Sequence, residues 1–259
     1  MGILNCTPDS FYDGKRASAH TFTKNAIALV ESGADIIDIG GESSRPGANP
    51  VSLEEEKSRV LPIIKNLIKE VPNITISIDT YKAEMAKHAI DEGVRYVNDI
   101  KGNTWNELSQ YVSKNNIPYI CMHMQGEPET MQLNPQYHSV VKDIIDELNM
   151  IKIKLLDHGL ASENLIWDPG IGFGKSLNNN LTIMKHLNEF SQQNKTLLGV
   201  SRKSYIANIC GDHIQPKDRL PGSLAPLAFA IKHNIDIVRV HDVRETKQFL
   251  DVYSSIDNI

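Results

Sequence analysis

Short apolar runs that end in a polar residue recur along this chain. Most of them are followed by a Gly/Pro-rich turn or by a segment with helical periodicity. In a parallel barrel the C-terminal ends of all strands open onto one mouth, so side chains placed there converge on one ligand. The pattern therefore predicts a barrel and its ligand site together. The polar residues at these ends include Asn5, Asp79, Asn98, Asp168, Arg239 and His241.

Eight strand–helix units fit into the sequence. The chain has 259 residues, close to the ~250 typical of a (β/α)8 barrel. We therefore predict an α/β fold of the TIM-barrel type, with residues 1–259 forming a single domain. The alternative is a doubly wound open sheet, which usually carries a GxGxxG turn after its first strand; NCTPDS at 5–10 is not such a turn. Strand ends are expected near Asn5, Gly40, Asp79, Asn98, Met122, Asp168, Gly199 and His241.

Helix boundaries have recognisable signals. The apolar residues from Leu61 to Val71 recur at helical spacing, and Ser52 with Glu55 forms a capping box in front of them. Asp242 with Glu245 forms a similar capping pattern directly after His241. Gly33 and Gly93 stand where C-cap glycines are expected.

Charge and cysteine usage exclude several classes of protein. The net charge is −5 without a basic block, which argues against nucleic acid or an anionic membrane as partner. No apolar run approaches the ~20 residues of a membrane span. Cys6, Cys121 and Cys210 share no CxxC spacing, which indicates reduced thiols in a cytoplasmic protein rather than a disulfide framework or a zinc site.

Strand alternation predicts which side chains face the barrel interior. Successive side chains point to opposite faces of a sheet. If Ile76 and Ile78 pack against helices, Asp79 lies at the inner rim. The other side chains expected inside include Thr75, Ser77, Ile166, Asp168, Ile237, Arg239 and His241, whereas Trp167, Val238 and Val240 face outward.

Three further segments contain groups suited to ligand binding. DPGIGFGKS at 168–176 resembles a nucleotide P-loop, but Pro169 stands where the first glycine belongs. Its glycines instead predict a sharp turn that lets Phe173 overhang the mouth, or a packed hydrophobe on a long loop. GGESSRPG at 40–47 presents Arg45 for an anion or as part of a lid, or as solvated surface charge. SRKS at 201–204 follows a strand and opens a helix, whose N-terminus favours anions.

Most histidines have no motif around them. His241 is the exception among the nine, and His123, between Met122 and Met124, fits a hydrogen-bonded core histidine. No HExxH or His/Cys cluster is present, so any metal is expected to be a hard ion that arrives with a phosphate.

Together these segments resemble the dihydropteroate synthase family, in order and over nearly the whole chain. The matching segments are MGILNCTPDSF at 1–11, GGESSRPG at 40–47, SIDT at 77–80, NDI at 98–100, DPGIGFGK at 168–175, SRKS at 201–204 and RVHDV at 239–243. The resemblance implies a (β/α)8 barrel and a homodimer. It also implies an enzyme that joins 4-aminobenzoate to a dihydropterin methyl diphosphate for folate synthesis, and a target of sulfonamides.

The same resemblance assigns roles to individual residues. The pterin would be held by Asp79, Asn98, Asp168 and Lys203. The diphosphate would be held by Asn5, Arg239 and His241, with Asn5 also a ligand of Mg2+, and Val240 would be a further substrate-binding residue. The aminobenzoate side would be formed by Phe11, Ser44, Arg45, Pro46, Phe173 and Ser204. Asn5, Arg45, Lys203, Arg239 and His241 would act directly in catalysis.

The sequence departs from the family pattern at two points, and two alternative functions are also considered. The family usually has Thr where Ser44 stands, and it usually begins its first strand several residues earlier. One alternative is a pterin-binding barrel that passes methyl groups from a folate to a corrinoid protein, which would need neither the pair Arg239 and His241 nor the loop with Arg45. The other is a paralogue that binds pterin without catalysis.

Overall fold

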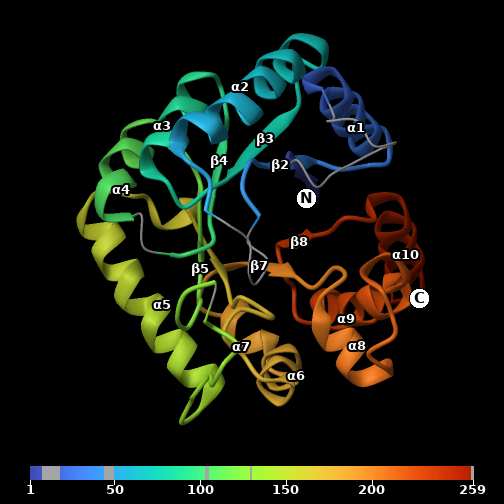
Figure 1. Cartoon of the computed structure of the whole chain (residues 1–259). Coiled ribbons are helices and arrows are strands. Elements are labelled where there is room, and N and C mark those ends of the chain that lie inside the picture. Colours follow the sequence, from blue (N-terminus) through green and yellow to red (C-terminus); the bar gives the residue numbers. More distant parts are fainter. Residues whose placement is uncertain (8–17, 44–49, 103–104, 129, 258–259) are drawn as a thin grey trace.

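Eight parallel strands form the inner ring of the fold (Figure 1). The computed structural model describes residues 1–7, 18–43, 50–102, 105–128 and 130–257. The strands pair in the order of the sequence, each with the next. They are β1 Gly2–Asn5, β2 Ile36–Gly40, β3 Thr75–Asp79, β4 Tyr96–Asp99, β5 Tyr119–Met122, β6 Leu165–Asp168, β7 Lys195–Gly199 and β8 Ile237–Arg239. The first seven end within one residue of the predicted positions, and β8 ends shortly before His241.

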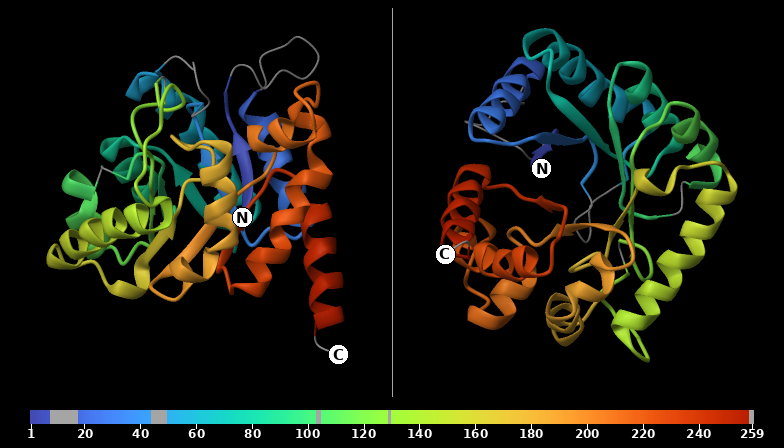
Figure 2. Two further views of the ribbon diagram at one scale, coloured as in Figure 1. Left: turned by 90° about the horizontal axis from the view of Figure 1, so that it is seen from below. Right: turned by 180° about the vertical axis from the view of Figure 1, so that it is seen from behind.

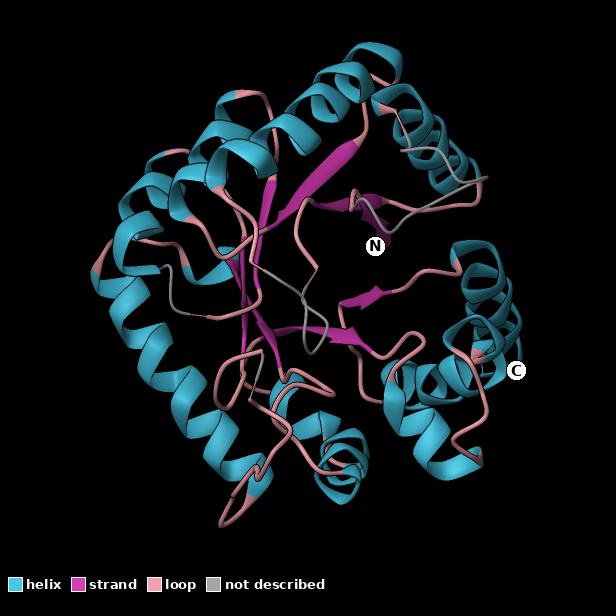
Figure 3. Ribbon diagram, in the orientation of Figure 1, coloured by secondary structure: helices cyan, strands magenta, loops and turns pink. Residues whose placement is uncertain are grey.

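Helices cover the outside of this ring, as Figure 3 shows by colour. The helices of the described part are α1 Ala19–Glu31, α2 Leu53–Glu70, α3 Ala83–Asp91, α4 Trp105–Lys114, α5 Val140–Asp157, α6 Leu177–Lys185, α7 Leu187–Ser191, α8 Ser204–Cys210, α9 Leu220–Lys232 and α10 Val243–Asp257. Short 3-10 turns lie at Ser162–Asn164 and Pro216–Asp218. The last two helices lie side by side in both views of Figure 2. No helix among the described residues is long and apolar enough to cross a membrane.

The ring closes where the end of β8 meets β1. Val240 forms a parallel bridge with Gly2, its N–H donates to the Met1 carbonyl (3.0 Å), and its carbonyl accepts from Ile3 N–H (2.9 Å). These bonds join the last strand to the first. The predicted (β/α)8 barrel is therefore confirmed, and the open doubly wound sheet is excluded.

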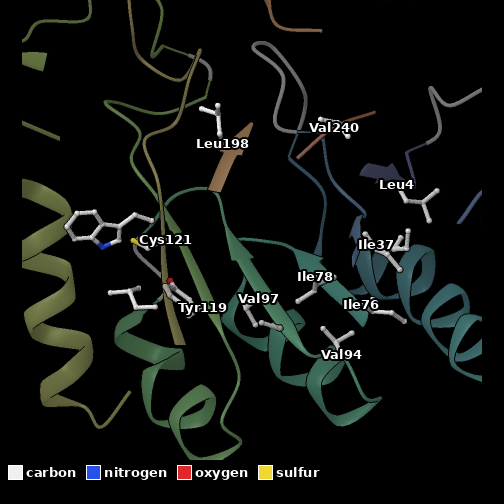
Figure 4. Packing of buried hydrophobic residues seen from close by; sticks show 14 of the residues in the cluster. Leu4, Ile37, Ile76, Ile78, Val94, Val97, Tyr119, Cys121, Leu198 and Val240 are labelled. Atoms are coloured by element: carbon white, nitrogen blue, oxygen red, sulfur yellow. The ribbon is translucent and has the colours of Figure 1, made fainter. Parts of the chain in front are cut away.

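Alternation along the strands sorts apolar side chains into two cores. The outer core, between strands and helices, contains Ile76, Ile78, Trp167 and Val240, as predicted (Figure 4 shows part of it). The inner core lies within the ring and consists of Met1, Ile120, Ile166 and Leu197, with Ile36, Tyr96 and Ile237 packed against it. Because the inner positions are apolar at the bottom of the ring, the polar residues nearer the strand ends gather at the mouth.

Local caps follow the sequence signals at most boundaries. Ser52 Oγ accepts a hydrogen bond from Glu55 N–H (3.2 Å) at the start of α2. Gly33 and Gly93 adopt φ of 100° and 107° just after α1 and α3. The Asp242 carboxylate, expected to cap α10, instead pairs with the guanidinium of Arg202. That carboxylate therefore ties the end of β8 to the loop after β7.

Candidate functional site

The strand register places the predicted polar residues at one level of the barrel. Asn5 pairs with Gly40, Gly40 with Asp79, and Asp79 with Asn98. Further round the ring Met122 pairs with Asp168, and Gly199 pairs with Arg239. All of these positions lie at the C-terminal ends of their strands, the end at which barrel enzymes bind their ligands.

Arg239 is held between two carboxylates at the centre of this mouth. Its Nε donates to Asp38 Oδ2 (2.6 Å) and its Nη2 donates to Asp79 Oδ2 (2.6 Å). Asn98 Nδ2 donates to the same Asp38 oxygen (2.9 Å). The guanidinium therefore joins β8 to β2 and β3, and Asp38 extends the network to β4.

Asp38 is the residue that the sequence analysis missed. It is fully buried, and its second oxygen, Oδ1, has no hydrogen-bond partner among the described atoms. Asp38 stands between Ile37 and Ile39, which pack outward, so strand alternation alone puts it inside the ring. The signal was therefore present in the sequence, but Asp38 lies two residues before its strand ends.

Burial and charge together set the ionisation of this group. Burial raises the pKa of Asp79 to about 7; the Asp38 and Glu56 carboxylates add to the rise, and Arg239 and Lys203 oppose it. Burial alone would lower the pKa of Arg239, but the Asp38 and Asp79 carboxylates outweigh it and raise that pKa. Arg239 therefore stays charged, while Asp79 titrates near neutral pH.

A tight glycine-containing turn follows Asp168. The Asp168 Oδ1 accepts a hydrogen bond from Gly170 N–H (2.8 Å), and Gly170 has a φ of 69°. A Cβ at this position would lie 2.0 Å from the His123 carbonyl oxygen, so only glycine fits. The predicted sharp turn is confirmed. Burial raises the pKa of Asp168, whereas the Gly170 bond and the nearby cations, Lys203 first, oppose the rise.

Lys203 and Phe173 meet above this turn. The Lys203 Nζ lies 4.1 Å from the centroid of the Phe173 ring. Burial lowers the pKa of Lys203 to about 8; Asp168 and Asp79 oppose this fall and Arg239 adds to it. Phe173 is half-buried beside a cation of the mouth, as expected of a residue that overhangs it.

His241 is fixed by the loop after β7. Its backbone N–H donates to Ser201 Oγ (3.1 Å), and its Nδ1 lies 3.0 Å from the same oxygen. Burial, with Arg239 and Arg202 adding to the effect, lowers the pKa of His241 to about 3. The ring is therefore neutral at physiological pH. If the Ser201 hydroxyl donates to Nδ1, then Nε2 carries the proton and can donate to a ligand.

Val240, between these two residues, is turned away from the mouth. Its side chain lies in the outer core, and its N–H and carbonyl are used to close the barrel. The predicted ligand contact of Val240 therefore has no support in the geometry. This outward position follows from strand alternation, because Arg239 and His241, on either side of Val240, face inward.

The remaining predicted residues divide into two groups. Asn5 is half-buried at the end of β1, and Ser204 is exposed at the start of α8. The rest of the aminobenzoate wall lies outside the described residues: Phe11, Ser44, Arg45 and Pro46.

A small cavity adjoins Asp79 on the side of β2 and β4. It has a volume of about 80 Å³, and Glu42, Tyr81 and Ile100 contribute to its lining. Lys82 lies beside it and donates to Glu56 (2.7 Å) and to Glu42. This ion group lies at the base of the loop that leaves β2.

The site combines buried acids, an amide and two cations at the mouth of a (β/α)8 barrel. This is the layout of an enzyme whose ligand offers several hydrogen-bond donors. A family model described as "Pterin binding enzyme" matches residues 1–241. Dihydropteroate synthase of Escherichia coli (strain K12) is 40% identical over 258 residues, covering 97% of this chain and 89% of the relative.

Solved structures agree with this match. The Yersinia pestis dihydropteroate synthase with a sulfonamide drug has a TM-score of 0.92 at 35% identity, covering 100% of this chain and 94% of that chain. The Xanthomonas albilineans enzyme in complex with 7,8-dihydropteroate has a TM-score of 0.89 at 32% identity, covering 100% and 93%. The chain therefore belongs to the pterin-binding enzyme family, within its dihydropteroate synthases.

Proposed function

We propose that this protein condenses 4-aminobenzoate with (7,8-dihydropterin-6-yl)methyl diphosphate, giving 7,8-dihydropteroate and diphosphate in folate biosynthesis. The observation that carries this proposal is the convergence of Asp79, Asn98 and Asp168 with Arg239 and His241 on one barrel mouth. The family match and the dihydropteroate bound by the Xanthomonas albilineans relative support it.

The acids and the amide suit the pterin. A dihydropterin presents a 2-amino group and a ring N–H, a row of donors that calls for carboxylate or amide acceptors. Asp168 and Asp79 are buried carboxylates at the mouth, and Asn98 donates to Asp38 in the same network. In this proposal Lys203 donates to the opposite edge of the ring, and its position beside Phe173 supports that role.

The diphosphate is assigned to Arg239 and His241, at the end of β8 and just after it. Arg239 has five N–H donors in a fixed fork, and its bonds to Asp38 and Asp79 use two of them. His241 is neutral and can donate from Nε2. In our proposal these two residues bind the oxygens on which charge develops as the diphosphate leaves.

Asn5 fits the role of a Mg2+ ligand. It is half-buried at the end of β1, level with Asp79, and offers an amide oxygen, the hard ligand that Mg2+ prefers. Among the described residues there is no group of three or more His, Cys, Asp or Glu side chains that could hold a metal. In this proposal Asn5 would hold the ion together with the diphosphate, and the ion would supply charge neutralisation there.

The reaction needs no side-chain nucleophile. The bond between the pterin methylene carbon and the diphosphate oxygen breaks, and its electron pair leaves with the diphosphate. The remaining cation is delocalised into the reduced ring, the aminobenzoate nitrogen forms a bond to the methylene carbon, and that nitrogen releases a proton. Buried groups that hold both substrates contribute by orientation and by stabilising the leaving charge.

We assign the aminobenzoate side to Phe173, Ser204 and the residues at 11 and 44–46. Phe173 and Ser204 lie beside Lys203, which supports the assignment for these two. Since α8 has only seven residues, the Ser204 hydroxyl rather than the helix N-terminus is the group proposed for the carboxylate. A sulfonamide drug, which the Yersinia pestis relative binds, would take the same side.

The assembly and the cellular location are also proposals. Exposed apolar side chains on α8, α9 and α10, namely Ile209, Phe229, Val252 and Ile256, support a homodimer. Size-exclusion chromatography with light scattering tests it. The three unpaired cysteines fit a cytoplasmic protein.

One assay separates this function from its alternatives. We expect diphosphate release from the pterin substrate to depend on 4-aminobenzoate and to yield dihydropteroate. A folate:corrinoid methyltransferase would release none, and a non-catalytic paralogue would bind the pterin without turnover. The pair Arg239 and His241 at the mouth favours the synthase.

A further inference from the structure

A buried chain of three titratable side chains runs from the surface of α5 to the turn behind Asp168. Lys175 is 2% exposed, and its Nζ lies 2.9 Å from His123 Nδ1. The same Nζ donates to the carbonyl of His123 (3.2 Å) and to the carbonyl of Phe173 (2.9 Å). His123 Nε2 lies 3.2 Å from Glu147 Oε2, and the Glu147 side chain is 56% exposed. None of these three side chains has a role in the proposed chemistry.

The hydrogen bonds indicate which atoms of Lys175 and His123 carry protons. A lysine ammonium has three donors and no acceptor, and Lys175 has three acceptors around it. His123 Nδ1 then accepts, so Nε2 carries the proton and donates to Glu147. Burial, with Lys175 adding to the effect, lowers the pKa of His123, which fits a neutral ring. Burial lowers the pKa of Lys175 to about 7; Asp168 and Glu147 oppose this fall and Lys203 adds to it, so the ammonium form prevails below that pH.

Lys175 contacts the backbone behind two residues of the proposed substrate site, Phe173 and Asp168. It holds the backbone of Phe173, whose ring lies under Lys203. It also packs close to the turn after Asp168, because a Cβ at Gly170 would lie 3.3 Å from Lys175 Nζ. Its charge is one of the cations that oppose the rise in the pKa of Asp168.

We propose that Lys175 is a positioning residue for the condensation. Its buried ammonium fixes the backbone of Phe173 against that of His123, and its positive charge keeps the Asp168 carboxylate ionised for the pterin. Lys175 touches neither substrate. The inference rests on the proposed function, because that function gives Asp168 and Phe173 their ligands.

Two variants separate the hydrogen bonds from the charge. Lys175→Met removes both, whereas Lys175→Gln keeps two N–H donors and removes the charge. Lys185→Met is the matched control, because Lys185 is exposed on α6, the helix that follows the same loop. The readouts are the KM for each substrate against kcat, and the pKa of Asp168 from the carboxyl ¹³C signal of aspartate-labelled protein.

We expect Lys175→Met to raise the KM for 4-aminobenzoate about tenfold, the effect of losing roughly one hydrogen bond. The pKa of Asp168 should rise by on the order of one unit in both Lys175 variants, because each lacks the nearby positive charge. Lys175→Gln should recover part of the 4-aminobenzoate KM without recovering the pKa. Lys185→Met should change neither quantity.

Three results would overturn the inference: unchanged KM values in folded Lys175→Met, an unchanged Asp168 pKa, or equal effects in Lys185→Met. Failure of both Lys175 variants to fold would assign the residue to the fold rather than to the site, which also overturns it. If the wild-type protein makes no dihydropteroate, the proposed function fails. The Asp168 titration still reads the effect of Lys175 in that case.

Discussion

Asp38→Asn should lower the free energy of unfolding and at the same time let the protein bind pterin at lower pH. Asp38 is fully buried and accepts from Arg239 Nε (2.6 Å) and Asn98 Nδ2 (2.9 Å) through one oxygen. Asparagine keeps the shape and one acceptor but removes the charge. Breaking a buried ion pair costs roughly 3–5 kcal/mol, and Arg239 retains Asp79, so we expect a loss of about 3 kcal/mol in unfolding free energy. For a chain of this size that lowers Tm by roughly 6–12 °C.

The same substitution should extend pterin binding to lower pH. The pKa of Asp79 is raised to about 7 by burial first and by Asp38 next, so in the wild type the carboxylate is lost as pH falls through 7. Both carboxylates bond one guanidinium, so for this calculation we take their charges as on the order of 6 Å apart. At an effective dielectric constant of ~20 their repulsion is then about 3 kcal/mol, or about two pKa units. Removing Asp38 should therefore move the acid limb of pterin affinity down by about one to two pH units.

The assays are urea unfolding at pH 7.5 and calorimetric pterin binding from pH 5 to 8. The matched control is Asp35→Asn, an exposed aspartate just before β2, which should leave both quantities unchanged. An acid limb that stays in place or moves to higher pH in Asp38→Asn would refute the argument that Asp38 raises the pKa of Asp79.

Four further substitutions test the other groups at the mouth. Asp79→Asn should weaken pterin binding by about 1.5–3 kcal/mol per lost charge-assisted bond, and near-unchanged affinity in calorimetry would remove Asp79 from the pterin pocket. Arg239→Ala should lower turnover, bare-pterin affinity and stability together, the last by roughly 3–5 kcal/mol, because it leaves Asp38 and Asp79 without their cation; an unchanged denaturation midpoint would contradict this. His241→Gln should cut kcat by about 10²–10³ and leave the shape of the pH profile between 5 and 8 intact, since the pKa of His241 is lowered to about 3; loss of a limb in that range would show that the wild-type ring titrates there. The pKa of Lys203 is lowered to about 8, so this residue loses its charge above that pH and the pterin affinity of the wild type should decline there. Lys203→Met should show no such decline when pterin binding is measured by calorimetry in alkaline buffers.

Strand ends and facing directions could be predicted because both follow from local rules. Alternation fixed the outward position of Trp167 and the inward position of Arg239. The same rule, applied to Ile37 and Ile39, places Asp38 inside the ring. A search limited to the last residue of each strand misses it, because Asp38 lies two residues before the end of β2.

Partners from neighbouring loops could not be predicted, because they depend on three-dimensional register. Asp242 has the sequence context of a helix cap, yet its carboxylate meets Arg202 from another loop. Lys175 ends a glycine-rich motif, and two of its three acceptors belong to His123, in the loop after β5. Neither contact has a signature in sequence spacing. The roles of the residues at 11 and 44–46 stay predictions, because those residues lie outside the described part of the chain.

The closure of the ring through Val240 bears on the order in which the protein folds. The carboxylates that bond Arg239 stand 201 and 160 residues before it, and Val240 pairs with the first three residues of the chain. Contacts of such large sequence separation form slowly, because the loop-closure entropy must be overcome first. During synthesis, Asp38 and Asp79 therefore remain without their guanidinium until Arg239 itself has left the ribosome. A nascent chain that stops before Arg239 can form strand–helix units but lacks the guanidinium that bonds Asp38 and Asp79.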